Sequence, residues 1–247
     1  MRVGVIADIH ANAVAFDTVV DALDRERLDT VLCLGDVALS GPQPRECLER
    51  LQARGWPTIM GNSDAAVLAP TLSKNMDEDS RRVEEIDFWC MEQLSASDRS
   101  YIATFKPVIE MDLGGVSLLA FHGSPRSNRD IITATTRNVD LAAMISSASV
   151  DVLVGGHTHT PMLRRYRGSF LLNPGSVGLP FLSRGIEWNE DAWNPPWAEY
   201  LLLSVDNGVL DLQFRRVPID VDAVLEAARR SSMPHVQCWC KDWQEPV

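Results

Sequence analysis

The chain has 247 residues, of which 45% are hydrophobic and 23% are charged, so it is long and apolar enough to form a globular protein with a substantial core. Its net charge of −11 argues against nucleic acid or an anionic membrane as the main partner. A small phosphate compound is compatible with this charge, because bound divalent cations reverse the potential locally. No stretch approaches the roughly 20 apolar residues of a membrane span.

The five cysteines are odd in number and lack the spacing of a disulfide framework, which favours a reducing compartment. We interpret Cys238 and Cys240 as a fortuitous pair rather than a zinc site. The amino terminus shows no signal-peptide pattern, because a strand-like run begins at residue 2 without a basic or long apolar segment. We therefore expect a soluble cytoplasmic protein.

The first 60 residues predict a strand followed by a helix, twice, and then a third strand. Apolar runs and helical spacing place these elements at 2–7, 12–28, 30–34, 44–54 and 57–60. Such repeats predict a largely parallel sheet whose ligands gather at the carboxyl ends of its strands.

Residues 65–105 change character, because apolar residues recur there at helical spacing beside a densely charged stretch. We interpret this segment as a helical insertion. It either caps a site or forms a solvated helix that only packs on the sheet, and the sequence leaves both readings open.

The rest of the chain predicts mainly antiparallel strands. Hairpins are expected over 108–121, 163–172 and 200–214, with a helix at 138–147 and a buried strand at 151–154 between the first two. The irregular loop 184–197 either closes over a substrate or covers a sheet edge. A last helix is expected at 222–230 and a loosely held tail at 231–247. Since no internal linker or repeat is found, we expect one domain over residues 1–247.

Residue types that bind metals follow the predicted strands. In the stretch from Val152 to His159, two glycines end a buried strand and two imidazoles then stand two residues apart. Suitable side chains occupy seven such positions, namely Asp8, His10, Asp36, Asn62, His122, His157 and His159. One alone is commonly a helix cap or a structural residue, but together they predict a metal site with nitrogen and oxygen ligands. His235 lies in the tail and is expected to be inert.

These residues resemble the five sequence blocks of the calcineurin-like metallophosphoesterases. The blocks stand in order as Asp-Ile-His, Gly-Asp, Gly-Asn, a lone His after a strand, and Gly-His-Thr-His, and the resemblance runs from residue 1 to about residue 230. It is closest to small bacterial and archaeal phosphodiesterases and phosphatases that also contain the motifs found here at 122–126 and 173–178. The resemblance implies an α/β fold, a four-layer αββα sandwich of two mixed β-sheets with helices outside.

The resemblance also implies two divalent metal ions, with Mn²⁺ the leading candidate and Fe, Zn²⁺ or Ni²⁺ as alternatives. One ion would be held by Asp8, His10 and His159. The other would be held by Asn62, His122 and His157, and Asp36 would bridge the two ions. Among these residues, the catalytic ones would be Asp36, Asn62 and His122.

The implied activity is hydrolysis of a phosphate ester by a metal-bound hydroxide, with a phosphodiester as the leading substrate class. The alternatives are a phosphomonoesterase or protein phosphatase, and a catalytically silent interaction module on the same fold. The filled ligand positions favour an enzyme. Arg126, Arg129 and Arg184 are candidates for binding the substrate phosphate, although surface arginines are commonly just solvated. The oligomeric state is left open.

Two positions depart from the family pattern. The third block often reads Gly-Asn-His-Asp, and its histidine is thought to protonate the leaving group, but this chain has Ser63 there. We therefore expect a preference for good leaving groups, unless another donor such as Asp64 or a metal-bound water supplies the proton. The first block usually continues with Gly where this chain has Ala11, which matters only if that backbone needs a positive φ.

Overall fold

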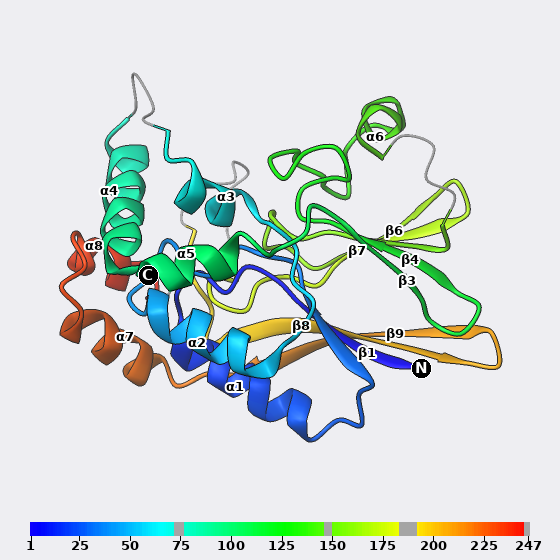
Figure 1. The fold of residues 1–247 in the computed structure, drawn as a ribbon, viewed down its shortest axis with the longest axis horizontal. Coiled ribbons are helices and arrows are strands. Elements are labelled where there is room, and N and C mark those ends of the chain that lie inside the picture. The colour runs from blue at the N-terminus through cyan, green and yellow to red at the C-terminus, as the bar shows by residue number, and fades with distance from the viewer. Residues whose placement is uncertain (72–76, 146–149, 183–191, 245–247) are drawn as a thin grey trace.

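The computed structural model describes residues 1–71, 77–145, 150–182 and 192–244. Two β-sheets, each containing parallel and antiparallel pairs, pack face to face, and helices cover their outer faces (Figure 1). The predicted α/β fold, a four-layer αββα sandwich with two mixed sheets, is confirmed.

The first sheet has the strand order β2-β1-β8-β9. Its strands are β1 (Arg2–Ile6), β2 (Thr30–Cys33), β8 (Trp197–Asp206) and β9 (Val209–Pro218). The central strand β1 runs parallel to β2 and antiparallel to β8. The predicted hairpin between β8 and β9 turns at Asn207 and Gly208, whose φ angles of 49° and 76° suit a tight two-residue turn.

The second sheet has the strand order β3-β4-β5-β7-β6. Its strands are β3 (Ile109–Asp112), β4 (Ser117–Ala120), β5 (Val152–Val154), β6 (Met162–Tyr166) and β7 (Ser169–Asn173). The strands β4, β5 and β7 are mutually parallel, and antiparallel strands flank them on both sides. The carboxyl ends of β4 and β5 therefore lie at one edge of this sheet.

The helices fall into three groups (Figure 1). Against the first sheet lie α1 (Ala13–Asp24), α2 (Pro44–Arg54) and α7 (Val221–Arg230). Against the second sheet lies α6 (Asn138–Ile145), whose Leu141 and Ile145 pack on that sheet's outer face. At one end of the sandwich, on the left of Figure 1, gather α3 (Asn62–Leu68), α4 (Glu78–Gln93), α5 (Ala96–Ile102) and α8 (Val236–Lys241).

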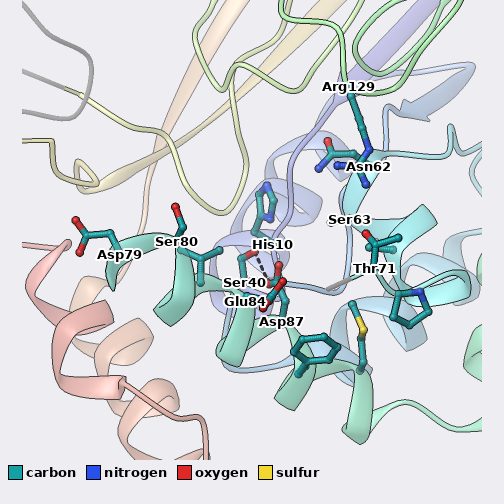
Figure 2. Close-up of a pocket in the computed structure, with 15 residues that line it drawn as sticks. His10, Ser40, Asn62, Ser63, Thr71, Asp79, Ser80, Glu84, Asp87 and Arg129 are labelled. Atoms are coloured by element: carbon teal, nitrogen blue, oxygen red, sulfur yellow. Dashed lines mark hydrogen bonds between the residues drawn. The ribbon is translucent and has the colours of Figure 1, made fainter. Parts of the chain in front are cut away.

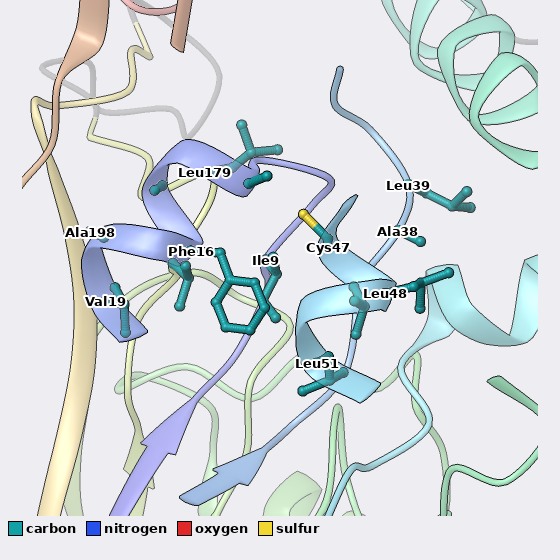
Figure 3. Close-up of a cluster of buried hydrophobic side chains, with 14 of the residues drawn as sticks. Ile9, Phe16, Val19, Ala38, Leu39, Cys47, Leu48, Leu51, Leu179 and Ala198 are labelled. Carbon is teal, nitrogen blue, oxygen red and sulfur yellow. The ribbon is translucent and has the colours of Figure 1, made fainter. Parts of the chain in front are cut away.

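Successive side chains along a strand point to opposite faces of the sheet, so the core is divided into layers. Val3 and Val5 of β1 face the second sheet, while Ile6 of the same strand faces the helices. On the helical side, Phe16 of α1 is fully buried and packs beside Leu51 of α2 (Figure 3). Burial of one such side chain contributes about 1.5–3 kcal/mol, so this layer anchors β1 and the loop that follows it.

Two sequence predictions differ from the structure. The third strand expected at 57–60 is reduced to isolated bridges, Cys33 with Thr58 and Ile59 with Lys106, because Pro57 has no backbone N–H for a longer ladder. The tail expected to be loosely held contains α8, whose Trp239 is buried. Among the described residues, no helix is both long and apolar enough to cross a membrane. All five cysteines are free thiols.

Candidate metal centre

The chain bends sharply where β1, β2 and β5 end. Residues in the left-handed region follow these strands, with φ of 57° at Asp8, 56° at Asp36 and 69° at His157. Ala11 also has a positive φ of 51°, so the backbone at this departure from the family pattern is one that glycine would adopt more easily. Left-handed conformations are costly for residues with a side chain, by about 1–3 kcal/mol each, and cluster where function demands them.

The segment 173–178, which is distant in the sequence, fixes the chain at the end of β1. Ser176 Oγ donates to the Asp8 carbonyl at 2.8 Å, and the backbone N–H of Gly178 donates to the same carbonyl at 3.0 Å. Asn12 Nδ2 in turn donates to the Gly178 carbonyl at 3.1 Å. A Cβ at Gly178 would overlap the Ile9 carbonyl, so only glycine allows this approach.

The polar residues after the strands meet in one place, between the carboxyl ends of the two sheets. Two groups could each hold a metal ion, with ligand atoms that lie within 4.8 Å of one another: Asp8 with His10 and His159, and Asp36 with His122 and His157. Asn62 joins the second group, since its side-chain amide lies 3.0 Å from His122 Nε2. The structure therefore brings together all seven side chains that the sequence singled out.

Asp36 lies between the two groups. Its Oδ2 is 3.3 Å from His122 Nε2, in one group, and 3.8 Å from His10 Nε2, in the other. Its Oδ1 accepts the backbone N–H of Ser63 at 2.9 Å, which fixes the carboxylate plane. This is the position that a bridging ligand would occupy.

The donor set of the first group fits a cation. His10 Nδ1 is 3.2 Å from the Leu39 carbonyl, and His159 Nδ1 is 2.7 Å from the Leu179 carbonyl. Because a carbonyl only accepts, both protons belong on Nδ1 and both Nε2 atoms carry a lone pair. These two Nε2 atoms are only 3.0 Å apart. Two lone pairs this close repel each other unless a cation lies between them, so this pair of nitrogens would suit a bound metal ion.

Burial favours the neutral forms of most ligands in this group. It lowers the pKa of His10, and it lowers the pKa of His159 to about 3, with further repulsion from His10. Burial likewise raises the pKa of Asp8 to about 8. Neutral imidazoles are ready to bind a metal, whereas Asp8 must lose a proton when a cation arrives.

His122 in the second group behaves differently. Burial opposes its protonation, but the adjacent Asp36 carboxylate outweighs this and raises the pKa of His122 to about 10. Its Nδ1 is 2.8 Å from the Leu34 carbonyl, so the additional proton sits on Nε2, toward Asp36. A metal ion would take the place of that proton, as it does at other histidine ligands.

Asp64 supports the site in a way that sequence reasoning missed. Its carboxylate is fully buried and accepts three backbone N–H groups, from Asp36 at 2.7 Å, from Val37 at 3.0 Å and from Gly61 at 3.0 Å. These bonds tie the loop after β2 to the start of α3. The signal in the sequence is the Asp three residues after Gly61, where a helix cap is commonly completed.

A cavity of about 540 Å³ opens beside the ligands (Figure 2). His10, Asn62 and Ser63 line it on the ligand side, and α4 forms the opposite wall. Since α4 belongs to the segment expected as a helical insertion, this segment contributes directly to the wall of the site. The loop expected at 184–197 lies mostly outside the described residues.

The three candidate arginines have different surroundings. Arg129 lines the cavity near Asn62 (Figure 2). Arg126 is exposed and paired with Asp130, its Nε lying 2.6 Å from Oδ2, so its guanidinium is already engaged. Arg184 lies outside the described residues. Of these arginines, the structure brings Arg129 to the candidate site.

Comparison with known proteins gives matches over most of the chain. Residues 1–188 match the calcineurin-like phosphoesterase superfamily domain. An uncharacterized protein of Methanocaldococcus jannaschii is 23% identical over 193 residues, which make up 72% of this chain and 76% of that protein. The structure of a metallophosphoesterase from Sphaerobacter thermophilus is 24% identical with a TM-score of 0.74, and the match covers 98% of both chains. A hypothetical protein from Pyrococcus horikoshii is 17% identical with a TM-score of 0.78, over 97% of this chain and 96% of that one.

Proposed function

The chain belongs to the calcineurin-like phosphoesterase superfamily, and on this premise we propose that it hydrolyses phosphodiesters with the help of two divalent metal ions. The position of Asp36 carries the proposal. Its carboxylate contacts both ligand groups, and a carboxylate placed in this way holds two cations close together. Mn²⁺ is our first candidate, because the side chains offer nitrogen and oxygen atoms and no thiolate.

The residues of the site would have the following roles. Asp8, His10 and His159 would hold one ion; Asn62, His122 and His157 would hold the other. When bound, such a pair of ions supplies Lewis acidity toward phosphoryl oxygens and acidifies a water molecule for attack. Asp36, fixed by the Ser63 N–H and by the loop that Asp64 holds, keeps the two groups in register. Arg129 would bind a free phosphate oxygen at the rim of the cavity.

The charges around the cavity support a diester rather than a monoester. Asp79 and Glu84 line the wall that α4 contributes, and Arg129 stands opposite. A phosphodiester carries one negative charge and a monoester up to two, so acidic side chains disfavour the monoester more. Esterification of the second oxygen also gives the substrate a group that can fill the cavity beyond the ligands.

The proposal is tested by comparing esters with matched leaving groups. Metal-free protein would be supplied with Mn²⁺, and kcat/KM measured for bis(p-nitrophenyl) phosphate and for p-nitrophenyl phosphate, with chelated protein as the control. We expect metal-dependent hydrolysis that is faster for the diester. A preference for the monoester would favour the phosphomonoesterase or protein phosphatase alternative. Absence of turnover in protein that holds its metal would favour a catalytically silent interaction module.

A further inference from the structure

The residue that protonates the leaving group is missing from its expected place. Ser63 has no acidic proton of useful strength, and its buried Oγ has no hydrogen-bond partner among the residues that the structure describes, although the residue lines the cavity. Asp64 is fully buried and already accepts three backbone N–H groups, so it does not face a substrate. The orphan hydroxyl of Ser63 marks this part of the cavity as one where a ligand atom is needed.

We infer that Asp87, on the α4 wall of the same cavity, donates the proton to the departing ester oxygen. The inference rests on the proposed phosphoester hydrolysis. Asp87, Ser63 and His10 line one cavity (Figure 2), so the leaving group of a substrate phosphate held at the ligands would extend into the cavity that Asp87 lines.

Two consecutive residues of the loop after β2, Leu39 and Ser40, hydrogen-bond to the imidazole of a candidate metal ligand and to the Asp87 carboxyl. Ser40 Oγ donates to Asp87 Oδ1 at 2.8 Å, while the carbonyl of Leu39 accepts from His10 Nδ1 at 3.2 Å. Ser40 has a positive φ of 70°, and its carbonyl accepts the indole N–H of Trp239 at 3.0 Å. The loop is therefore fixed in a strained form that keeps the carboxyl at a set place beside the ligands.

The hydrogen bond from Ser40 also determines which oxygen can act. Because Oδ1 accepts the hydroxyl proton, the acidic proton of Asp87 would sit on Oδ2. As the attacking hydroxide bonds to phosphorus, the bond from phosphorus to the ester oxygen breaks and its electron pair stays on that oxygen. The Asp87 carboxyl gives its proton to this oxygen, which yields a neutral alcohol and a carboxylate. A proton from water then restores the acid.

The surroundings of Asp87 favour its protonated form. Burial raises the pKa of Asp87 to about 7, and the carboxylates of Asp36 and Glu84 add to this, whereas the hydrogen bonds from Ser40 oppose it. Within the described part of the chain, the other charged or titratable groups that line the cavity are His10, Asp79 and Arg129. A general acid is most effective when its pKa lies near the working pH, and this carboxyl meets that condition.

The test uses methyl aryl phosphates whose phenols range from nitrophenol to unsubstituted phenol. In Asp87→Asn, which keeps the shape of the side chain, kcat/KM for the phenyl ester should fall by about 10²–10⁴-fold while the nitrophenyl ester changes little. The parent protein should lose activity toward the phenyl ester as the pH rises through about 7. The activity of the variant should show no such decrease in this pH range. Glu92→Gln, an exposed carboxylate on the same helix, is the matched control and should behave as the parent.

Two results would overturn the role of Asp87. An equal loss on all esters in Asp87→Asn would mean that the residue only supports the fold, and no loss on any would mean that it is idle. If the variant does not fold, the test is made on the parent protein. A steep dependence of its rate on the pKa of the leaving group, with chemistry rate-limiting, would exclude an internal proton donor. Failure of the proposed function would give a different result from failure of the Asp87 role. The parent protein with Mn²⁺ would then not hydrolyse any of these esters, including the nitrophenyl ester.

Discussion

Replacement of Asp36 by Asn isolates the charge of the proposed bridge. The residue is 2% exposed, and its Oδ1 accepts the Ser63 N–H at 2.9 Å. An asparagine has the same shape and can keep that bond through its own oxygen. The other oxygen, which faces His122 and His10, becomes an NH₂ group that cannot bind a cation. The variant therefore removes one negative charge between the two ligand groups with little change in packing.

The size of the effect follows from the distances in the site. Asp36 Oδ2 lies 3.3 Å from His122 Nε2 and 3.8 Å from His10 Nε2, so a cation in either group would be close to Asp36. Two unit charges about 4 Å apart attract by about 4 kcal/mol at an effective dielectric constant of about 20. Since about 1.4 kcal/mol is a factor of ten in a binding constant, metal binding should weaken by about 10³-fold or more.

Calorimetric titration of metal-free protein with Mn²⁺ measures this loss. Asn62→Ala is the comparison variant, because it removes one neutral ligand from the second group and should weaken binding less than Asp36→Asn. Catalytic activity should follow the same order. Binding of both ions by Asp36→Asn within tenfold of the parent would refute the bridging role.

Residues that support or belong to the ligand groups can be tested one at a time. Asp64→Asn should lower the free energy of unfolding by about 2–3 kcal/mol, measured by urea denaturation, because an amide cannot accept all three backbone N–H groups; an unchanged midpoint would contradict this. Gly178→Ala should lower the melting temperature, since its Cβ overlaps the Ile9 carbonyl, and wild-type stability would mean that the segment moves freely. In metal-free protein kept in chelator, Asp8 has a pKa of about 8 when the chain is folded and of 3.8 when it is unfolded. The folded state therefore holds an extra proton between these two pH values. As the pH rises from about 4 to about 8, the parent should lose stability relative to Asp8→Asn. Melting curves across pH check this, and a constant difference would contradict it.

The convergence of the candidate ligands could be predicted because it follows from strand geometry. Asp8 and Asp36 come directly after two parallel strands, and His122 and His157 after another parallel pair, so each pair must meet at a sheet edge. The meeting of the two edges is set by the packing of the sheets, which the spacing of residues within one strand does not reveal. The family resemblance supplied that step.

The support around the ligands could not be predicted because it comes from contacts distant in the sequence. Ser176 and Gly178 hold the end of β1 although roughly 170 residues separate them from Asp8, and their motif alone gave no indication of this partner. Asp87 lies beside a densely charged run, and the sequence leaves open whether this helix caps a site or is only a solvated helix. Its hydrogen bond to Ser40 depends on where α4 docks, and no local pattern encodes that position.

The weak elements of the chain were the hardest to predict. Residues 57–60 have strand-like composition, but Pro57 limits their pairing to single bridges. Residues 231–247 look polar, yet Trp239 is buried and its indole bonds to Ser40, which makes α8 part of the support for the cavity wall. In both cases a single residue, Pro57 or Trp239, outweighs the average character of its segment.

Hydrolysis by a paired metal site is tested most directly by one titration that records two quantities. Metal-free protein is loaded stepwise with Mn²⁺, and bound metal and hydrolysis of bis(p-nitrophenyl) phosphate are measured in the same samples. We predict that about two ions bind per chain and that most of the increase in hydrolysis occurs as the second ion binds. Full activity with one ion bound per chain, or no activity with both bound, would contradict the proposed two-metal hydrolase.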